Sequence, residues 1–599
     1  MTTQKYAVNQ HLIEILLAWV KSGEIAIPEI QRPFVWDASQ VRDLLDSLYK
    51  GYPVGYVIAW RNPNVRLKDG TLSEGKKVLI DGQQRVTALT AALLGQPVIN
   101  KEYKSVRIRI AFHPIEQRFE VVNPAIEKDK AWFHDIAPIV SGEVKLLKLI
   151  NDYCLANDNA DADLLEDRIE RLKGILKKQI GLIELAGDLD IETVTEIFIR
   201  INSKGVVLSQ ADFVMSKIAA NESMGGHLLR KAIDYFCHVA RAPEFAAHIE
   251  KNDTDFASSE FWPAMKWLQQ DNDDLYDPSY SDLIRVAFTS QFHRGRLADL
   301  VALLSGRNFE TRTYEHDIAE TSFAALKTGV QAFINKTNFQ RFLIIIKSAG
   351  FVTNRLIKSG MSLNFAYVLY LTLRTKYGND PRIESWVRRW FVLSLLTGRY
   401  SGSPESAMDT DIRHIASREF TEVLAEVEAA KLSDSFWQVG LVQDLTTPSS
   451  NSPAFNVFLA AQVKLGSRGF LSKDISVRDL ISHQGDIHHL FPKNFLKKQG
   501  RERGSYNQVA NYVYMQQEVN IKIGERDPAI YFSHVITQCT NGQALFGGIT
   551  SHEDLLQNLV ENCIPANQAL QGNLQDYDTF LQERRILMAA MMQKYYQGL

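Results

Sequence analysis

Two adjacent histidines, His488 and His489, stand immediately before a Leu-Phe-Pro triplet, and Asn511, Asn520 and Lys522 follow them in the chain. An imidazole has a pKa close to neutrality, so it can take a proton from water at ordinary pH. A divalent metal can absorb the charge that develops on a phosphate and on its departing oxygen. Hydrolysis of a phosphodiester bond requires a base and a cation of this kind.

The order and spacing of these residues resemble the HNH nucleases of the ββα-metal class. The resemblance implies that His489 is the general base, that Asn511 orients it and that Lys522 neutralises a phosphate. It implies a site for Mg²⁺, Mn²⁺ or Ni²⁺ whose ligands are His488, Asn520 and, as a supplement, Asp486. The family more often has an acidic residue at the first of these positions. An imidazole suits Mn²⁺ or Ni²⁺ better than Mg²⁺, so the sequence leaves the metal open.

A basic strip follows the histidine pair. The formal net charge of the chain is −3, so any contact with nucleic acid must be a local patch. The strip is suited to the backbone of DNA. Its members are Lys493, Lys497, Lys498, Arg501 and Arg503.

A second pattern near the N-terminus is typical of phosphate binding. An apolar strand runs into Asp81 and Gly82, and a helix is expected directly after Gln83, Gln84 and Arg85. The first N–H groups of a helix have no partner inside it, and the helix dipole favours an anion there. The alternative is an Asp N-cap followed by solvated glutamines, and spacing alone favours that alternative.

Three further stretches carry a second resemblance. They are Ile-Pro-Glu-Ile-Gln-Arg-Pro-Phe-Val-Trp from residue 27, Gly-Tyr-Pro-Val-Gly from residue 51, and Phe-Ile-Arg-Ile-Asn-Ser-Lys-Gly from residue 198. With the Asp-Gly-Gln-Gln-Arg turn, they resemble the ParB/sulfiredoxin-like domain of the Gmr-type (GmrSD-like) restriction family. The resemblance implies binding and hydrolysis of an NTP, with GTP, ATP, CTP and UTP all open. The residues that it adds to the turn are Gln31, Arg32, Asn202 and Lys204.

The fold class expected is α+β with several domains. We predict a ParB/sulfiredoxin-like domain at 1–225, a helical middle region at 226–440 and an HNH nuclease domain of ββα-metal type at 441–599. The Ser-, Thr- and Pro-rich tract from Leu441 to Pro453 predicts a linker at the second boundary. Helical periodicity predicts an opening helix that includes Leu12 and a helix from Leu164 to Ile180.

Five arginines of the middle region allow two interpretations, a DNA-facing patch or an ion-paired surface. Several acidic residues lie close to them in the sequence, which favours the ion-paired surface. The five are Arg382, Arg388, Arg389, Arg399 and Arg413.

Composition narrows the class of protein. The chain has 599 residues, of which 45% are hydrophobic, and its four cysteines are far apart, which gives neither a zinc knuckle nor a disulfide framework. We find no signal peptide and no apolar run long enough to cross a membrane, and we expect a cytoplasmic protein.

Together these features predict an NTP-regulated, modification-dependent DNA endonuclease of type IV restriction, which cuts or nicks modified phage DNA in bacterial defence. Two alternatives are a nucleotide-dependent DNA-binding switch with an inactive HNH domain, and an RNA-directed nuclease toxin. The modification sensed and the oligomeric state, including a homodimer, are left open.

Overall fold

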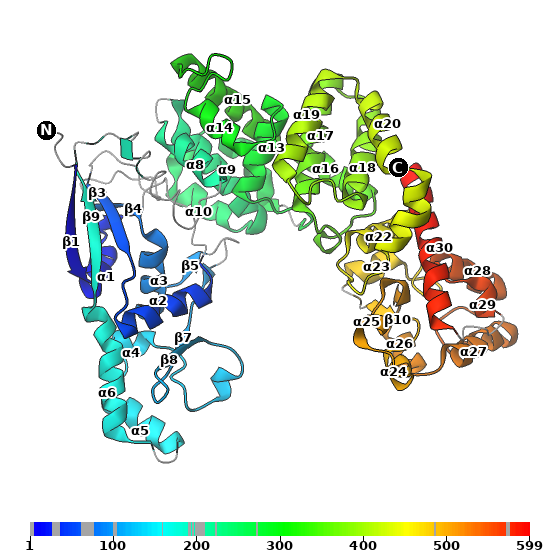
Figure 1. The fold of residues 1–599 in the computed structure, drawn as a ribbon, viewed down its shortest axis with the longest axis horizontal. Coiled ribbons are helices and arrows are strands. Elements are labelled where there is room, and N and C mark those ends of the chain that lie inside the picture. The colour runs from blue at the N-terminus through cyan, green and yellow to red at the C-terminus, as the bar shows by residue number, and fades with distance from the viewer. Residues whose placement is uncertain are drawn as a thin grey trace. The chain divides into compact units, whose positions relative to one another are not determined.

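The computed structural model describes most of the chain. The described residues are 5–26, 36–61, 77–99, 105–157, 160–187, 189, 193–194, 197, 210–221, 224–270, 273–483, 485, 487–570 and 576–599. The chain divides into two compact units, the first made of Met1–Gln270 with Val301–Phe323 and the second of Asp271–Leu300 with Ala324–Leu599 (Figure 1). The predicted α+β, multidomain class is confirmed. No helix among the described residues has both the length and the apolar character that a membrane span needs.

The first unit is built on a five-stranded sheet with the strand order β1-β9-β3-β4-β2. Strand β9 runs parallel to β3 and antiparallel to β1, while β4 runs antiparallel to β3 and parallel to β2. The strands are β1 (Tyr6–Leu12), β2 (Ile25–Ala26), β3 (Tyr56–Arg61), β4 (Lys77–Asp81) and β9 (Gln179–Leu185).

Two of these strands correct the sequence-based expectation. The opening helix α1 begins only at Ile13, because the residues before it form β1. The predicted helix that ends at Ile180 is shorter, since α6 ends at Lys173 and Gln179 already belongs to β9. Strands β1 and β9 pair along their whole length, with Leu12 opposite Gln179. Pairing between segments so far apart in the sequence overrides the local helical pattern.

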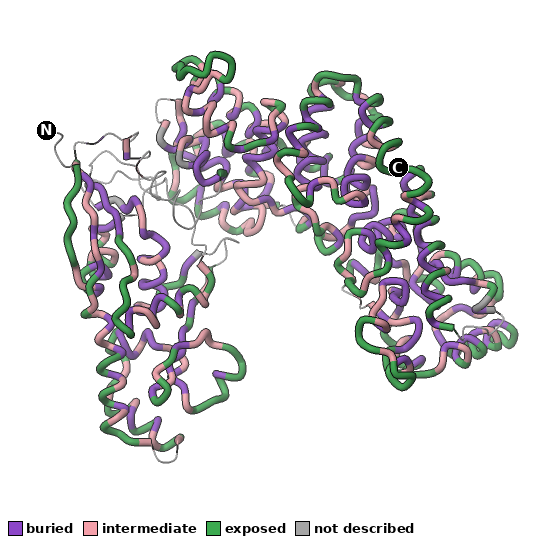
Figure 2. The backbone as a smooth tube through the Cα atoms, in the orientation of Figure 1, coloured by how far each residue is buried: buried purple, intermediate pink, exposed green. Residues whose placement is uncertain are grey.

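Helices cover both faces of this sheet. One core contains residues of α1 (Ile13–Ser22), α2 (Ala38–Lys50) and α3 (Gln83–Leu93) packed with Leu79 and Leu182. A second core on the other face contains Ile58, Trp60 and Ile80. Neighbouring residues of a strand point to opposite faces, which places Leu79 and Ile80 in different cores. Figure 2 shows the buried positions that result.

The other described α-helices and strands of the Met1–Gln270 part of this unit lie between residues 98 and 265. They are β5 (Val98–Ile99), β6 (Ser105–Val106), β7 (Ile110–His113), β8 (Arg118–Val121), α4 (Ala137–Val140), α5 (Leu146–Ala156), α6 (Ala162–Lys173), α8 (Gln210–Ala220), α9 (Gly226–Arg241), α10 (Phe245–Asn252), α11 (Thr254–Ala257) and α12 (Phe261–Met265). Residues 226–270 therefore cluster with the first unit, which differs from the boundary predicted at 225.

The predicted helical middle region is helical. Its helices are α13 (Tyr280–Phe292), α14 (Leu297–Leu304), α15 (His316–Ile334), α16 (Lys336–Ser348), α17 (Gly360–Tyr377), α18 (Arg382–Leu396), α19 (Pro404–Ser417) and α20 (Phe420–Lys431). All five arginines singled out above form ion pairs, for example Arg399 with Asp411 and Arg389 with Glu428. These pairs agree with the interpretation of an ion-paired surface.

The tract predicted as a linker is not one. It contains α21 (Leu441–Asp444), and its Pro453 is the first residue of α22 (Pro453–Leu465). The Thr447 carbonyl accepts a hydrogen bond from Val509 N (2.9 Å), and the Pro448 carbonyl accepts one from Tyr512 Oη (3.2 Å). Ser452 is the N-cap of α22 and Pro453 is its first residue. Ser and Pro are common both at helix starts and in linkers, so composition alone does not distinguish the two.

The C-terminal part of the second unit carries the histidine pair. It contains α23 (Val477–Ser482), β10 (Ile487–His489), α24 (Lys493–Lys498), α25 (Arg503–Tyr506), β11 (Tyr512–Tyr514), α26 (Gln517–Ile523), α27 (Pro528–Asn541), α28 (His552–Glu561), α29 (Ala566–Leu570) and α30 (Tyr577–Gln597). Helix α30 packs against α21 and α22, so this part and the helices before it belong to one compact unit.

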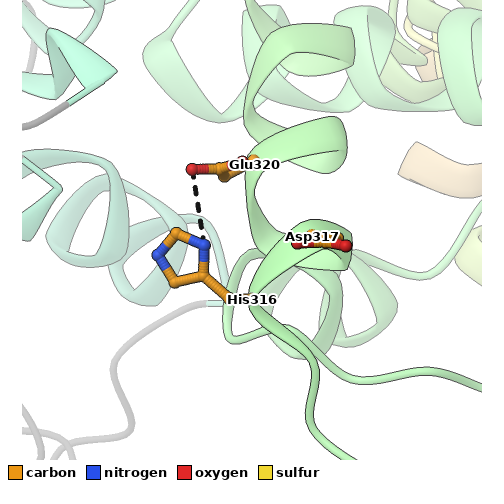
Figure 3. A group of neighbouring side chains, drawn as sticks. All are labelled: His316, Asp317 and Glu320. Atoms are coloured by element: carbon orange, nitrogen blue, oxygen red, sulfur yellow. Dashed lines mark ion pairs between the residues drawn. The ribbon is translucent and has the colours of Figure 1, made fainter.

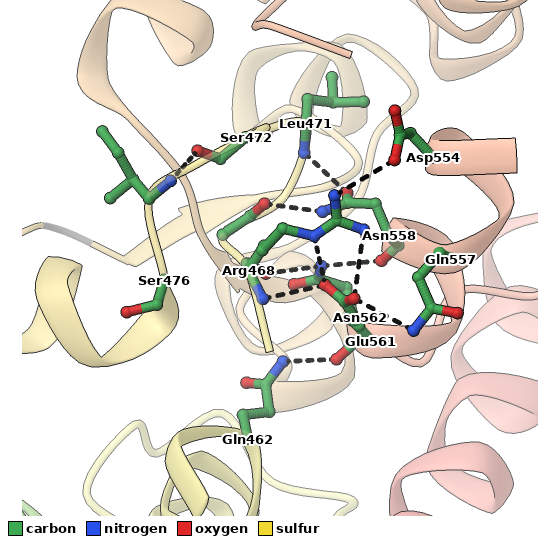
Figure 4. A network of polar contacts seen from close by, with 12 residues as sticks. Gln462, Arg468, Leu471, Ser472, Ser476, Asp554, Gln557, Asn558, Glu561 and Asn562 are labelled. Atoms are coloured by element: carbon green, nitrogen blue, oxygen red, sulfur yellow. Dashed lines mark hydrogen bonds and ion pairs between the residues drawn. The ribbon is translucent and has the colours of Figure 1, made fainter. Parts of the chain in front are cut away.

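A buried polar network fixes the segment that runs beside β11 (Figure 4). Asn558, fully buried on α28, accepts a hydrogen bond from Leu471 N (2.9 Å) and donates one to the Gly469 carbonyl (2.9 Å). Between these residues, Phe470 N donates to the Tyr514 carbonyl on β11 (2.8 Å). One side chain therefore holds the backbone that bonds to the end of β11.

Replacing Asn558 should destabilise the second unit. Asn558→Leu leaves two buried backbone groups without partners, which we expect to cost about 2–4 kcal/mol of unfolding free energy. Denaturant unfolding followed by tryptophan fluorescence measures this. Gln557→Ala is the control, because Gln557 is exposed and its side chain bonds to Glu561 (3.1 Å), with no other hydrogen-bond partner among the described residues. Equal stability of the two variants would contradict the assignment.

Candidate active site

A short antiparallel hairpin presents the two histidines. His488 pairs with Val513 and His489 pairs with Tyr512 across β10 and β11, and helix α26 follows β11 after two residues. The 22 residues between the strands (490–511) carry α24 and α25 and return the chain to the second strand. The hairpin thus gathers the predicted base, Asn511 and the basic strip around one pair of strands.

The imidazole of His489 is held by an asparagine that the sequence pattern does not single out. His489 Nε2 lies 3.0 Å from Asn507 Oδ1, and its ring meets the Tyr512 ring edge-on with centroids 5.2 Å apart. An amide oxygen can only accept, so Nε2 carries the hydrogen and Nδ1 keeps its lone pair. That nitrogen is the one able to take a proton.

The surroundings of His489 keep it neutral. Burial is the largest influence, and it holds the pKa of the imidazole below its ordinary value. The Lys493 ammonium acts in the same direction, whereas the hydrogen bond to Asn507 acts against both. A histidine with a lowered pKa is in the basic form throughout the neutral range.

The Asn511 side chain bonds to the backbone of the loop between the strands rather than to the imidazole. It is fully buried, its Oδ1 accepts from Phe491 N (2.8 Å), and its Nδ2 donates to the carbonyls of Phe491 (3.1 Å) and Tyr506 (3.2 Å). It therefore fixes the backbone on both sides of the loop between the strands. Any effect of Asn511 on His489 passes through that backbone, while the side-chain contact is made by Asn507.

The predicted metal ligands are only partly described. His488 is buried and Asn520 is half-buried on α26, while Asp486 lies outside the described residues. Lys522, predicted to face a phosphate, is exposed on the same helix as Asn520.

Among the described residues, three other side chains lie close enough together to bind one metal ion. His316, Asp317 and Glu320 at the start of α15 can bring one ligand atom each within 4.8 Å of the others, and His316 Nδ1 lies 3.3 Å from Glu320 Oε1 (Figure 3). All three are exposed on one helical turn. Such groups are common on surfaces, and we assign no function to this one.

The basic strip divides into neutralised and available cations. Lys498 pairs with Glu525 and Arg501 pairs with Asp578. Lys493 and Lys497 both lie over the Tyr506 ring, 5.9 Å from its centroid. Like Arg503, they are exposed and form no ion pair within the described part of the chain. These three cations are the available ones in the strip.

In the first unit, the Asp-Gly-Gln-Gln-Arg turn joins β4 to α3. Gly82 is the N-cap of α3, with φ +89° and no side-chain cap, and a Cβ there would lie 3.2 Å from the Val57 backbone. Gln83 and Gln84 are buried, so the alternative of an Asp N-cap with solvated glutamines is wrong. Gln83 Oε1 is buried without a hydrogen-bond partner among the described residues.

Arg85 turns back toward the sheet. Its guanidinium donates to the Tyr56 carbonyl and lies 4.0 Å from the Asp81 carboxylate. A Cβ on Gly55 would come within 3.4 Å of this guanidinium, so the second glycine of the Gly-Tyr-Pro-Val-Gly stretch makes room for it. The other residues predicted for this pocket, namely Gln31, Arg32, Asn202 and Lys204, lie outside the described residues.

Comparison with known proteins gives two matches. Residues 13–219 match the family model described as GmrSD restriction endonuclease, N-terminal domain, a span that includes the sheet and the Asp81–Arg85 turn. Over 564 residues the chain is 21% identical to an uncharacterized protein of Methanocaldococcus jannaschii, which covers 86% of this chain and 85% of that protein. The first match supports the GmrSD family for the N-terminal part of the chain.

The pKa of His489 gives a direct check of the site. We expect selectively ¹⁵N-labelled histidine, assigned with a His489→Gln variant, to show that the pKa of His489 lies below that of an ordinary exposed histidine. Lys493→Ala should raise that pKa, because it removes a nearby positive charge.

Lys497→Ala is the matched control, since Lys497 lies over the same Tyr506 ring but is not among the groups that shift His489. It should leave the titration unchanged. A wild-type His489 with a pKa above that of an ordinary exposed histidine would show that its ring is not held as described.

Proposed function

We propose that this chain, whose N-terminal part matches the GmrSD restriction endonucleases, is a restriction-type nuclease that acts on DNA in defence against phage. The observation that carries the proposal is the His489–Asn507 contact on a hairpin that also bears the available cations of the basic strip. The family match covers the first unit only, so the nuclease site in the second unit rests on this geometry and on the HNH resemblance.

In the proposed reaction His489 is the general base. Its Nδ1 takes a proton from water, the hydroxide oxygen bonds to phosphorus, and the bond from phosphorus to one ester oxygen breaks. Asn507 holds the imidazole in the tautomer that leaves Nδ1 open. Lys493, Lys497 and Arg503 bind the DNA backbone on one side, and Lys522 neutralises a further phosphate.

A divalent metal completes the proposed site. His488 and Asn520 would hold it, with Asp486 as a supplementary ligand. Both described donors are at least half-buried, and a neutral imidazole with an amide oxygen fits Mn²⁺ or Ni²⁺ better than Mg²⁺. The metal supplies stabilisation of the charge on the phosphate and on the departing oxygen.

The first unit is proposed to bind and hydrolyse an NTP that regulates cleavage. The support is the junction of β4 and α3, where Gly82 brings the backbone close and the α3 N-terminus offers N–H groups to an anion. Gln83 adds a buried amide whose unpartnered oxygen, among the described residues, can accept a hydrogen bond from a donor group of the nucleotide rather than contact its phosphates. Gln31, Arg32, Asn202 and Lys204 are proposed to complete the pocket, and dependence on a DNA modification is proposed on the family resemblance alone.

The nuclease proposal predicts loss of cleavage in His489→Ala. We expect at least about a thousandfold lower rate of nicking or cutting of plasmid or phage DNA with Mn²⁺, because general base and positioned water are lost together. Nucleotide binding should persist, since the base lies in the other unit.

His483→Ala is the matched control, because His483 is exposed six residues before the base and its ring nitrogen lies 2.8 Å from the Asp479 carbonyl oxygen rather than near His489 or Asn507. Parallel assays on DNA and RNA decide the substrate. Wild-type rates in His489→Ala would contradict the assignment of the base. Absence of DNA cleavage by the wild type with Mg²⁺, Mn²⁺ and Ni²⁺ would favour a DNA-binding switch, and preference for RNA would favour a toxin.

Substitution in the Asp81–Arg85 turn should impair nucleotide turnover. We expect Asp81→Ala or Arg85→Ala to lower NTP hydrolysis by roughly tenfold or more, since each disturbs the junction that presents the α3 N-terminus. Phosphate release with each of the four NTPs measures this. Arg118→Ala is the control, because Arg118 is an exposed, ion-paired arginine of the same unit. Unchanged turnover in purified, folded variants would remove the pocket.

A further inference from the structure

The last helix of the chain holds the loop that positions His489. We propose that α30 is a positioning element of the nuclease site, and that Tyr577 and Arg584 act on the base through the segment 501–511. The inference rests on the proposed function and adds residues that the HNH resemblance does not assign. From the sequence alone, this helix is most simply interpreted as a packing element.

One face of α30 meets the segment 501–511 along its length. Tyr577 Oη donates to the carbonyls of Ser505 (3.0 Å) and Tyr506 (3.3 Å), and Asp578 pairs with Arg501 (2.7 Å). One heptad later, Arg584 Nη1 donates to the Ala510 carbonyl (2.8 Å), and Arg585 Nη2 donates to Gln508 Oε1 (3.0 Å).

The spacing of these contacts identifies a single helical face. Tyr577 and Arg584 are seven residues apart, as are Asp578 and Arg585, and residues seven apart lie on the same side of a helix. Four side chains of α30 therefore form hydrogen bonds or ion pairs with both ends and the middle of the segment 501–511. A helix that only covered apolar core would not need this set of directed contacts.

Arg584 is the central member of the set. Its side chain is fully buried, and its donors reach the carbonyls of Ala510 and of Asn562 (3.3 and 3.1 Å). No carboxylate pairs with it within the described part of the chain, so backbone oxygens alone solvate a buried charge. A buried guanidinium satisfied in this way tolerates little movement of its acceptors.

Two short paths lead from these contacts to the imidazole. Arg584 donates a hydrogen bond to the Ala510 carbonyl, and Ala510 precedes Asn511. The Asn511 side chain in turn bonds to the backbone of Phe491, two residues after the base. Tyr577 donates a hydrogen bond to the Tyr506 carbonyl, and Tyr506 precedes Asn507. The Asn507 side chain is the hydrogen-bond partner of His489 Nε2. Both the backbone support of the base and its side-chain partner therefore depend on α30.

The other end of α30 offers a matched comparison. Tyr595 is buried on the same helix, and its Oη donates to the Ala349 carbonyl (2.5 Å) in the helical part of the same unit. Tyr577→Phe and Tyr595→Phe each remove only a hydroxyl that bonds backbone carbonyl. They differ in whether that bond reaches the segment 501–511.

The test compares these two variants in the full-length chain. We expect Tyr577→Phe to lower kcat for DNA cleavage with Mn²⁺ by roughly tenfold while KM changes less, because the base is displaced whereas Lys493 and Lys497 lie on α24, outside the segment 501–511. Tyr595→Phe should retain the wild-type kcat at a comparable loss of Tm. Arg584→Lys should keep more activity than Arg584→Met, since it retains a charged donor.

A second readout does not depend on cleavage. In ¹⁵N-histidine spectra, Tyr577→Phe should shift His489 away from the tautomer protonated at Nε2, and Tyr595→Phe should not. If the wild type cuts no DNA but the His489 signals respond in this way, the proposed function fails and the positioning role stands. If both variants leave kcat and the His489 signals equal, or change them equally, the positioning role is overturned.

Discussion

The hydrogen bond between His489 Nε2 and Asn507 Oδ1 is the contact on which the account of the second unit depends. It selects the tautomer, leaves Nδ1 able to take a proton and fixes the ring between Tyr506 and Tyr512. Burial and Lys493 then keep the imidazole neutral. Much of the surrounding structure, including the buried Asn511, the carbonyls of Thr447 and Pro448, and helix α30, holds the two backbone segments that this one bond connects.

The first unit depends on a comparable local constraint, the left-handed conformation of Gly82 between β4 and α3. A side chain at this position would press against Val57 and the Arg85 guanidinium, so the turn can approach the sheet only as glycine. Arg85 is held by the Tyr56 carbonyl and by Asp81, which gives it a structural role whatever it also binds. The N-terminus of α3 is thus presented by a rigid junction, as anion binding at a helix end requires.

The sequence predicted the parts of the fold that local pattern controls. The helical middle and the junction of β4 with α3 are of this kind. Strands β1 and β9 were missed because their pairing spans most of the first unit, which no local window contains. Asn507 was missed because its role comes from the path of the loop between the hairpin strands, and the family pattern draws attention to Asn511 instead. The Thr447–Pro448 anchor was missed because a composition typical of linkers also suits turns and helix caps.

The most direct measurement of the central claim is a crystal structure of the full-length chain with a short DNA duplex and Mn²⁺. If His489 is the base, a backbone phosphate lies at the hairpin, a water lies within hydrogen-bond distance of His489 Nδ1 and in line with the phosphorus, and Nε2 keeps its contact with Asn507. The opposite result would be DNA bound away from β10 and β11, or a His489 ring whose Nδ1 is occupied by a protein donor. Either would contradict the role of His489 as the base.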